Sequence, residues 1–275
     1  MEVFINGQFQ PASRATVSVQ DRGLLYGDGL FETLRAEGGR PVWLQHHLAR
    51  LTRSAAALNL PLPPQLPWAE TIVALLGRNN LATGTAAVKI LITRGETAVL
   101  GLPATDRPTV IISARPYTPP PPADYRQGWP VVCFPERRQC FLGNHKSLNY
   151  LFSLAARQYA LDHGGQEALI LEADGTVAEG AAAGLLWQEG GAYYTPQAAN
   201  ALPSVTLTVL EEILQRQGVA LRRAMLPVAR LLQAEGAWLA NSLMGLVPIS
   251  SVDGQPLALS PATDRLNEML WSESR

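Results

Sequence analysis

Lysine is almost missing from this 275-residue sequence, because only Lys89 and Lys146 are lysines among its 22 basic residues. Arginine cannot replace a lysine that must lose its proton, since a guanidinium stays charged whereas a buried ammonium can be pushed toward neutrality. Lys146 lies beside a glycine, an asparagine and a histidine in the segment before Tyr150. It is either an ordinary surface lysine or an amine nucleophile that forms a Schiff base with a carbonyl compound.

Cysteine and charge are also scarce. The two cysteines, Cys133 and Cys140, form neither a metal-type cluster with histidine nor a disulfide framework. Only 16% of residues are charged and the net charge is −1, with no basic run. This composition disfavours binding to nucleic acid or to an anionic membrane surface.

Long apolar runs are missing too, since none approaches the roughly 18 residues that cross a bilayer. The opening residues, MEVFINGQF, lack the basic and apolar regions of a secretion signal. We therefore expect a soluble, cytoplasmic protein. The sequence also lacks a Walker-type loop, a zincin pair, a nucleophile elbow and a dinucleotide fingerprint.

What the sequence does contain is enough apolar material for large cores, at 47% hydrophobic residues. Its length predicts two domains of roughly 100–150 residues each. The prolines at 119–122 cannot join a helix or a central strand and favour extended geometry. We therefore predict a first domain over 1–117, a proline-rich linker over 118–124 and a second domain over 125–275.

In the first domain, Asn6-Gly7 indicates a hairpin after a strand at 2–5. The Gly27-Asp28-Gly29 segment predicts a tight loop with its backbone close to a neighbour, followed by a strand at 31–36. Apolar residues at three- and four-residue steps predict a helix from Leu44. Another helix is expected over 68–76, with strands over 86–93 and 109–113.

The second domain alternates strands and helices. A helix is expected from Leu148 to Leu161, and another from about Thr206 to Gln217, with Gly218 as its C-terminal cap. Strands are expected over 131–134, 167–172, 176–180, 184–188, 237–240 and 248–252.

Polar residues in apolar surroundings mark the candidate site. Glu179 is the sole charged residue between Asp174 and Glu189, so it lies either at a solvated strand end or is held inward by a partner. Two segments could bind phosphate through backbone N–H groups and hydroxyls. They are 204–206, at a helix start, and 241–242, in a glycine-containing loop.

Several segments together resemble the class IV aminotransferase family. The matching stretches are 21–23, 26–32, 47–51, 146–151, 167–169, 174–180 and 241–245, which span most of the chain. The resemblance implies a fold-type IV pyridoxal-phosphate enzyme, a group that includes branched-chain and D-amino-acid aminotransferases and aminodeoxychorismate lyase. It implies an α+β fold with a smaller N-terminal α/β domain and a larger C-terminal pseudo-barrel α/β domain. It also implies a small-molecule substrate and a homodimer.

The resemblance further implies roles for single residues. Lys146 would bind pyridoxal 5'-phosphate as a Schiff base and move the reaction's proton. Glu179 would pair with the pyridine nitrogen and keep it protonated, so that the ring acts as an electron sink. Arg50 would bind the cofactor phosphate, and Tyr150 would lie next to the ring. Further cofactor contacts are expected from Val205, Thr206, Asn241 and Ser242.

Within the family, 241–248 most resembles aminodeoxychorismate lyase, which releases pyruvate and leaves 4-aminobenzoate for folate biosynthesis. D-amino-acid aminotransferases carry an arginine and a histidine shortly after the Arg94-Gly95 pair, whereas residues 96–101 supply neither. An aminotransferase acting on branched-chain or D-amino acids is the alternative, and a cofactor-binding relative without turnover is a second. Phe31, Thr33 and Arg35 are candidate substrate contacts, since strand alternation points them to one face.

The sequence departs from the family's pattern at four single positions, and its Arg94-Gly95 loop is shorter than in familiar lyases and lacks their glycine-arginine insert. Gly184 and Leu186 stand where the family usually has asparagine and phenylalanine, and Ser204 and Leu207 where it has glycine and arginine. None of the four replaces Lys146 or Glu179. They therefore bear on substrate choice and not on cofactor binding.

Overall fold

The computed structural model describes residues 1–63, 65–105 and 107–272. The last three residues of the predicted second domain lie outside this range. The chain divides into two compact units. Unit 1 comprises Met1–Thr118 and His145–Asn149, and unit 2 comprises Pro119–Asn144 and Tyr150–Arg275. The predicted boundaries at 117 and 125 stay a prediction.

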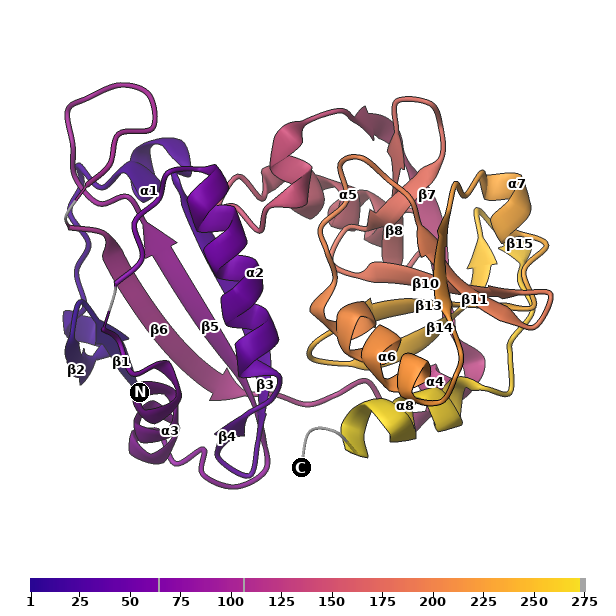
Figure 1. Ribbon diagram of the computed structural model, residues 1–275, viewed down its shortest axis with the longest axis horizontal. Helices are drawn as coiled ribbons and strands as arrows, with labels where there is room; N and C mark the ends of the chain where they lie inside the picture. Colours follow the sequence, from indigo (N-terminus) through magenta and orange to yellow (C-terminus); the bar gives the residue numbers. More distant parts are fainter. Residues whose placement is uncertain (64, 106, 273–275) are drawn as a thin grey trace. The chain divides into compact units, whose positions relative to one another are not determined.

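Unit 1 is built on an antiparallel sheet in the order β2-β1-β6-β5-β3-β4 (Figure 1). Its strands are β1 (Glu2–Ile5), β2 (Gln8–Pro11), β3 (Gly29–Glu37), β4 (Arg40–Pro41), β5 (Thr85–Thr93) and β6 (Thr109–Pro116). Its helices are η1 (Ala12–Arg14), α1 (Arg22–Tyr26), α2 (Leu44–Ala57) and α3 (Trp68–Arg78). The predicted hairpin is confirmed, with positive φ angles of 47° at Asn6 and 92° at Gly7 between β1 and β2.

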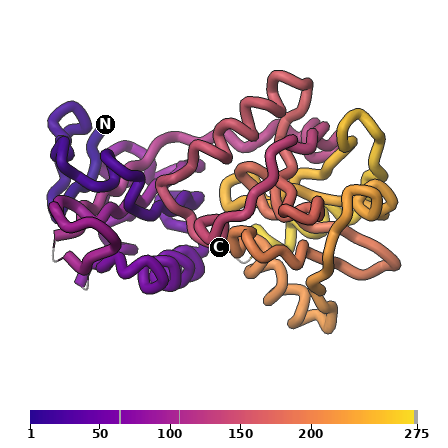
Figure 2. Tube along the Cα trace, turned by 90° about the horizontal axis from the view of Figure 1, so that it is seen from above, coloured from indigo at the N-terminus to yellow at the C-terminus, as the bar shows by residue number. Residues whose placement is uncertain are grey.

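One face of this sheet forms the core of unit 1. Leu30 and Leu34 on β3 and Ile90 on β5 are at most 1% exposed, and they point toward the side that the helices cover. Seen from above, α2 lies along one side of the strands (Figure 2). The predicted helix from Leu44 is confirmed, because its three- and four-residue apolar steps give one buried stripe.

The predicted tight loop at Gly27-Asp28-Gly29 is also confirmed. Gly27 ends α1 in the left-handed region at φ 66°. A Cβ on Gly29 would lie 2.5 Å from the carbonyl oxygen of Ile92, so a side chain there would displace the backbone of β5. Asp28 between them accepts hydrogen bonds from Arg22 and Arg94. These contacts join the loop to the end of β5.

Unit 2 is built on a mixed sheet in the order β12-β11-β10-β13-β14-β7-β8-β9, with β15 beside β14 (Figure 1). Its strands are β7 (Trp129–Arg138), β8 (Glu167–Glu172), β9 (Val177–Gly180), β10 (Gly184–Glu189), β11 (Ala192–Pro196), β12 (Leu221–Ala224), β13 (Gly236–Asn241), β14 (Gly245–Val252) and β15 (Gln255–Pro256). Its helices are α4 (Pro122–Gln127), η2 (Phe141–Asn144), α5 (Leu151–Asp162), α6 (Val205–Arg216), α7 (Val228–Leu231) and α8 (Thr263–Ser272).

The core of unit 2 lies around the central strands of this sheet. Trp187 on β10 and Leu239 on β13 are fully buried in it, together with Val247 and Ile249 on β14. The prediction that none of the prolines at 119–122 joins a helix is wrong for Pro122. It occupies the first position of α4, where its missing N–H costs nothing. No helix among the described residues is long and apolar enough to cross a membrane.

The predicted start of one helix is wrong. We expected it from Leu148, whereas α5 begins at Leu151. The reason is tertiary, since the Leu148 N–H donates to the carbonyl of Gly29 and Ser147 bridges to Leu30. The residues around Lys146 are thus extended alongside β3 and belong to unit 1, whereas the helix that follows belongs to unit 2.

Candidate active site

Lys146 is positioned by a short antiparallel pairing with the start of β3. The Phe31 N–H donates to the Lys146 carbonyl at 2.8 Å, and Leu30 lies opposite Ser147. This register sets Lys146 opposite Phe31, so both side chains point to the same face of the sheet. The Lys146 Nζ lies 4.5 Å from the centroid of the Phe31 ring. The lysine therefore projects from fixed backbone and not from a free loop.

A buried cluster of three charged or polar groups lies on the other face of β3, toward α2. Glu32 Oε1 accepts from Arg50 Nε at 2.8 Å, and Glu32 Oε2 accepts from Arg50 Nη2 at 2.6 Å. His47 Nδ1 lies 2.7 Å from Glu32 Oε2. All three side chains are at most 7% exposed. Such a bidentate pair fixes both the position and the plane of the guanidinium.

The charges in this cluster shift its pKa values in defined directions. Burial acts to raise the pKa of Glu32, but the hydrogen bonds and charges of Arg50 and His47 outweigh it and lower that pKa to about 2. Burial lowers the pKa of His47, against the pull of Glu32 and in the same direction as the charges of Arg50 and Lys146. Glu32 is therefore ionised and His47 neutral near pH 7, and neutral His47 donates its Nδ1 proton to Glu32.

This arrangement extends the sequence prediction for Arg50. The family resemblance implies that Arg50 binds the cofactor phosphate, and the structure places one edge of its guanidinium on Glu32. Its contact with phosphate stays a prediction. Sequence reasoning missed Glu32 and His47 as its partners. The signal was available, because His47 and Arg50 are three residues apart on one helix face and Glu32 alternates with Leu30 on β3.

Unit 2 holds Glu179 by a partner that the sequence analysis did not identify. Arg138 Nη2 donates to Glu179 Oε1 at 2.6 Å, and the Leu202 N–H donates to Oε2 at 3.1 Å. Glu179 is 8% exposed. Of the two sequence interpretations, the one in which a partner holds Glu179 inward is confirmed. Nothing in the sequence distinguished Arg138 from its neighbour Arg137, because the pairing depends on the register of β7.

The loop before α6 is anchored to the same group of residues. Arg138 Nη2 also donates to the Asn200 carbonyl, and the Asn200 N–H and Nδ2 each donate to Glu172 at 2.8 Å. Glu172 ends β8, directly before the turn that leads to Glu179 on β9. The buried carboxylates of Glu172 and Glu179, together with Arg138, therefore hold this loop in a fixed orientation. They contact it at Asn200 and Leu202.

The start of α6 carries a buried hydroxyl. Thr206 is fully buried, and its Oγ1 has no hydrogen-bond partner among the described residues. Ser204 caps the helix by accepting from the Leu207 N–H. A buried hydroxyl without a partner costs about 1–3 kcal/mol, and it lies where N–H groups and the helix dipole favour an anion. Thr206 and neighbouring Val205 therefore fit the phosphate group that the sequence predicted here.

The other predicted cofactor contacts make hydrogen bonds within unit 2. The Tyr150 hydroxyl donates to the Ala181 carbonyl at 3.1 Å. The Asn241 side-chain oxygen Oδ1 accepts from the Leu243 and Met244 N–H groups and closes the turn that contains Ser242. Ser242 itself is 9% exposed. The roles of these residues toward a cofactor stay predictions.

Three of the four departures from the family pattern touch one another. A Cβ on Gly184 would lie 2.9 Å from the Ser204 Cβ and 3.1 Å from the Leu207 Cδ1. The missing side chain at Gly184 therefore makes room for the other two. The changes form one repacked contact between β10 and the start of α6, and Glu179 keeps its partners.

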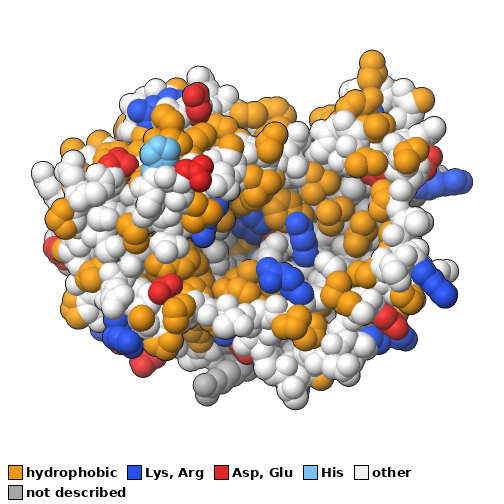
Figure 3. Space-filling model, turned by 180° about the vertical axis from the view of Figure 1, so that it is seen from behind, with side chains coloured by type: hydrophobic (Ala, Val, Ile, Leu, Met, Phe, Trp, Pro, Cys, Tyr) orange, Lys and Arg blue, Asp and Glu red, His pale blue; other side chains and the backbone are white. Residues whose placement is uncertain are grey.

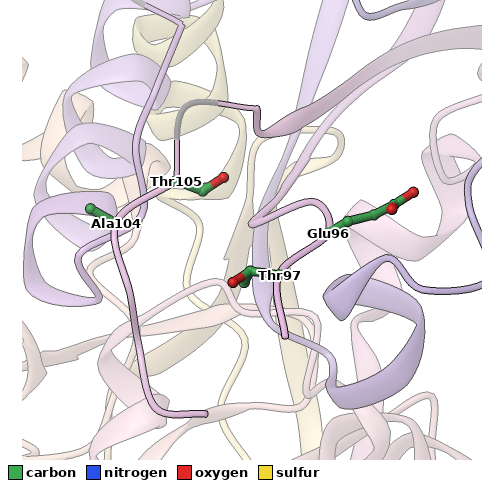
Figure 4. Close-up of a pocket in the computed structure, with 4 residues that line it drawn as sticks. All are labelled: Glu96, Thr97, Ala104 and Thr105. Carbon is green, nitrogen blue, oxygen red and sulfur yellow. The ribbon is translucent and has the colours of Figure 1, made fainter. Parts of the chain in front are cut away.

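A hollow of about 560 Å³ lies in the loop after β5, lined by Glu96, Thr97, Ala104 and Thr105 (Figure 4). Among the described residues, its lining offers a carboxylate and two hydroxyls, which do not suit an anionic ligand. Within the described residues, no group of three His, Cys, Asp or Glu side chains could hold a metal ion.

The family model described as Amino-transferase class IV matches residues 29–252. The chain belongs to the class IV aminotransferase family. It is similar to a curated "Putative branched-chain-amino-acid aminotransferase" from Methanocaldococcus jannaschii, with 30% identity over 93% of this chain and 89% of that one. It is also similar to "Aminodeoxychorismate lyase" from Bacillus subtilis, with 28% identity over 91% and 86%.

Solved structures share the fold. The 4-amino-4-deoxychorismate lyase from Pseudomonas aeruginosa has a TM-score of 0.85 and 32% identity, over 98% of each chain. The branched-chain amino acid aminotransferase from Escherichia coli has a TM-score of 0.87 and 26% identity, over 98% of this chain and 93% of that one. The predicted fold-type IV architecture is confirmed, with an N-terminal antiparallel sheet domain and a C-terminal curled half-barrel of mixed strands with helices.

Proposed function

We propose that the protein is a homodimeric, pyridoxal-phosphate-dependent aminodeoxychorismate lyase that produces 4-aminobenzoate and pyruvate for folate biosynthesis. The chain is a class IV enzyme of the aminotransferase and lyase family, and its cofactor is pyridoxal 5'-phosphate. When bound, this cofactor withdraws electrons from the substrate carbon next to the amine. Cofactor binding and proton removal are the tasks of residues of this chain.

The residues fit the cofactor group by group. Thr206 offers a buried hydroxyl without a partner in the described structure, at the N-terminus of a 12-residue helix, which suits a phosphate dianion. Glu179 offers a carboxylate to a pyridinium nitrogen, and Arg138 keeps that carboxylate oriented. Arg50 and Ser242 supply further donors for phosphate. Lys146 supplies the amine for the aldehyde.

The lyase reaction needs one base, which Lys146 provides. Its nitrogen removes the proton from the ring carbon that bears the amine, and the C–O bond between the ring and the enolpyruvyl group then breaks. Enolpyruvate leaves with the electron pair of this bond, takes up a proton and becomes pyruvate. Formation of the aromatic ring drives this step. Antiparallel pairing with β3 fixes the origin of the Lys146 side chain, and the Phe31 ring lies beside its nitrogen. Orientation of this kind lowers the barrier by holding the base close to the proton.

The observation that carries the lyase proposal over a D-amino-acid aminotransferase is the segment after β5. Residues 96–101 contain neither arginine nor histidine, the two residue types that D-amino-acid aminotransferases use here to hold a substrate carboxylate. The 32% identity to the Pseudomonas aeruginosa lyase over 98% of both chains supports the same assignment.

A branched-chain aminotransferase is the second candidate. It is favoured by the 30% identity to the putative branched-chain-amino-acid aminotransferase from Methanocaldococcus jannaschii. An aminotransferase would use the same lysine, carboxylate and phosphate donors. The two candidates therefore differ in the substrate that they accept.

Product analysis separates the candidates. The purified holoenzyme is incubated with aminodeoxychorismate, and in parallel with branched-chain or D-amino acids plus 2-oxoglutarate. We expect release of 4-aminobenzoate and pyruvate in equal amounts in the first reaction. Glutamate formation in the second, without 4-aminobenzoate in the first, would refute the lyase proposal and support the aminotransferase. A Lys146→Ala control must lose whichever activity is found.

A further inference from the structure

The bend at 181–183, which joins β9 to β10, begins two residues after Glu179 and is closed by backbone hydrogen bonds. The Gly180 N–H donates to the Ala183 carbonyl at 2.7 Å, and a second bond of 2.9 Å joins the first residue of the bend to β8. Glu179 is the last residue but one of β9. Whatever fixes this bend therefore also fixes the strand end that carries the Glu179 carboxylate.

Glu167, the first residue of β8, lies against this bend. A Cβ on Gly180 would be 3.3 Å from the Glu167 Cγ, so the two residues are packed together. The Glu167 carboxylate accepts from the Ala168 N–H at 3.0 Å and from the Ala182 N–H in the bend. Arg157 Nη1 on α5 donates to Glu167 Oε2 at 2.8 Å. One carboxylate thus joins β8, α5 and the bend.

The Glu167 carboxylate is withdrawn from water. On the face of the molecule in Figure 3, Asp and Glu side chains reach solvent at separate points, whereas Glu167 is 1% exposed. Burial raises the pKa of Glu167, although the Arg157 charge and the hydrogen bonds act to lower it. The Arg157 side chain is 34% exposed, so solvent screens part of its attraction. The ionised carboxylate is therefore held at a cost, and a gain in folding stability does not explain its presence.

One peptide unit of the bend, that between Ala181 and Ala182, links two side chains. Its N–H donates to the Glu167 carboxylate, and its C=O accepts from the Tyr150 hydroxyl at 3.1 Å. A peptide unit is planar and trans, so its N–H and C=O point in opposite directions and turn together. A carboxylate acceptor also polarises the unit and strengthens the hydrogen bond at its other end. Rotation of the unit away from Glu167 would therefore break its bond to Tyr150.

Asn241 contacts the next peptide unit of the bend. Its Nδ2 donates to the Ala182 carbonyl at 3.4 Å, while its Oδ1 closes the turn that contains Ser242. Three of the residues that the family resemblance implies as cofactor contacts thus adjoin the bend, namely Tyr150, Glu179 and Asn241. Each lies one hydrogen bond or a few backbone atoms away from the segment that Glu167 holds.

We propose that Glu167 is a positioning residue, which holds the bend so that Tyr150 and Glu179 meet the cofactor in a fixed orientation. This inference rests on the proposed function, because the cofactor roles of these two residues belong to it. Glu167 acts through backbone and is assigned no contact with the cofactor. The inference concerns cofactor orientation, and it holds for a lyase and for an aminotransferase alike.

Removing the ion pair separates a positioning role from a structural one. The double variant Glu167→Met/Arg157→Met replaces both charged groups by apolar side chains. Loss of two poorly solvated charges offsets loss of the hydrogen bonds, so the urea midpoint of the apoprotein should change little. The affinity for pyridoxal phosphate should nevertheless fall about 10-fold, because the bend loses the acceptor for its N–H. Equilibrium titration with pyridoxal phosphate measures this affinity.

Glu167→Gln is the milder variant and serves even if the double variant does not fold. It keeps an acceptor for the Ala182 N–H and loses the charge, so its affinity for pyridoxal phosphate should fall only about threefold. The visible circular dichroism of the bound cofactor, measured at saturation, should also be smaller than in the wild type. Both readouts report on the cofactor and not on turnover.

A double-mutant cycle tests the route from Glu167 to Tyr150. Tyr150→Phe removes the hydroxyl that donates to the bend. Glu167→Gln should therefore cost less affinity in the Tyr150→Phe background than in the wild type. Strict additivity would overturn the inference. A lower urea midpoint together with lower affinity, without coupling to Tyr150, would show that Glu167 has a structural role only.

The solvent-accessible pair of Glu211 on α6 and Arg223 on β12 is the matched control. Its removal in Glu211→Met/Arg223→Met takes the same two groups from unit 2 at a point that does not adjoin the bend. This variant should keep the affinity for pyridoxal phosphate and the visible circular dichroism of the wild type. An equal loss of affinity in this control and in the Glu167 variants would also overturn the inference.

Failure of this inference and failure of the proposed function have different signatures. Wild-type affinity and wild-type circular dichroism in both Glu167→Gln and the methionine double variant would overturn the positioning role and leave the lyase function intact. A wild type that does not convert aminodeoxychorismate would refute the lyase proposal. A Glu167-dependent affinity for pyridoxal phosphate that is coupled to Tyr150 would then still support the positioning role.

Discussion

Lys89 and Lys146 hold their side-chain nitrogens 4.7 Å and 4.5 Å from the centroid of one aromatic ring, that of Phe31. They are the only lysines of the sequence. Lys146 extends from the segment that pairs with one edge of β3, and Lys89 extends from β5, which pairs with the other edge of β3. The π-face of Phe31 attracts both ammonium groups, which share one face of the sheet.

Replacing Lys146 is expected to abolish both activity and covalent cofactor binding. Lys146→Ala should lower kcat by about four orders of magnitude and remove the visible absorption band of a cofactor joined to a lysine. Lys89→Ala is the matched control, because it removes the other lysine beside Phe31 and should keep the band. The absorption spectra of the two reconstituted variants check this. A band that persists in Lys146→Ala and disappears in Lys89→Ala would show that Lys89, and not Lys146, binds the cofactor covalently.

Glu32 is expected to stabilise unit 1 by neutralising Arg50. Glu32→Gln leaves a buried guanidinium without its carboxylate and should lower the free energy of unfolding by about 3 kcal/mol at pH 7. Exposed Glu70 on α3 is the control, and Glu70→Gln should change it by less than about 0.5 kcal/mol. Urea unfolding of the three proteins measures both differences. Equal effects of the two substitutions would contradict the importance of the buried pair.

The same pair gives a pH dependence with a defined sign. The pKa of Glu32 falls from 4.5 to about 2 in the folded protein. The contribution of ionised Glu32 to the free energy of unfolding is therefore complete above pH about 4.5 and is lost as pH falls toward 2. Unfolding free energies measured between pH 7 and pH 3 should show the gap between wild type and Glu32→Gln narrowing below pH 4.5. A gap that stays constant through that range would contradict the lowered pKa.

Arg138 is expected to act as a positioning residue through Glu179. Arg138→Met should lower kcat about 10-fold and weaken cofactor binding, because Glu179 loses its charged hydrogen bond. Arg138→Lys should restore part of the cofactor affinity. Exposed Arg137 supplies the control, since Arg137→Met removes the neighbouring charge from the same strand. Equilibrium titration measures the affinity of each variant for pyridoxal phosphate. Equal affinities for Arg138→Met and Arg137→Met would refute the positioning role of Arg138.

The contact among Gly184, Ser204 and Leu207 should show coupling. Gly184→Ala places a Cβ 2.9 Å from that of Ser204 and should destabilise the protein by about 1–3 kcal/mol. Combining it with Ser204→Gly should recover part of that loss. Gly77→Ala in α3 has open space and should stabilise by about 0.5–1 kcal/mol. Chemical denaturation of the four variants checks this double-mutant cycle. Strict additivity would show that the positions are independent.

Much of unit 1 could be predicted from local patterns. The Asn6-Gly7 turn requires positive φ angles that few other pairs adopt, and the apolar steps after Leu44 allow only one buried helix face. The exposed face of β5 was harder to interpret. Lys89 appeared as a lone lysine in the middle of a strand, because the sequence does not show that the register sets it beside Phe31.

The sequence by itself determined which chemical groups are available: one lysine in a family motif, a carboxylate at 179, and hydroxyls at the start of α6. These follow from residue identity and short-range spacing. Only the tertiary structure decided their partners. Strand register paired Arg138 with Glu179, helix packing paired Arg50 with Glu32, and extension along β3 kept Lys146 out of the helix after it. Each decision depends on contacts between residues far apart in the chain, which local patterns cannot specify.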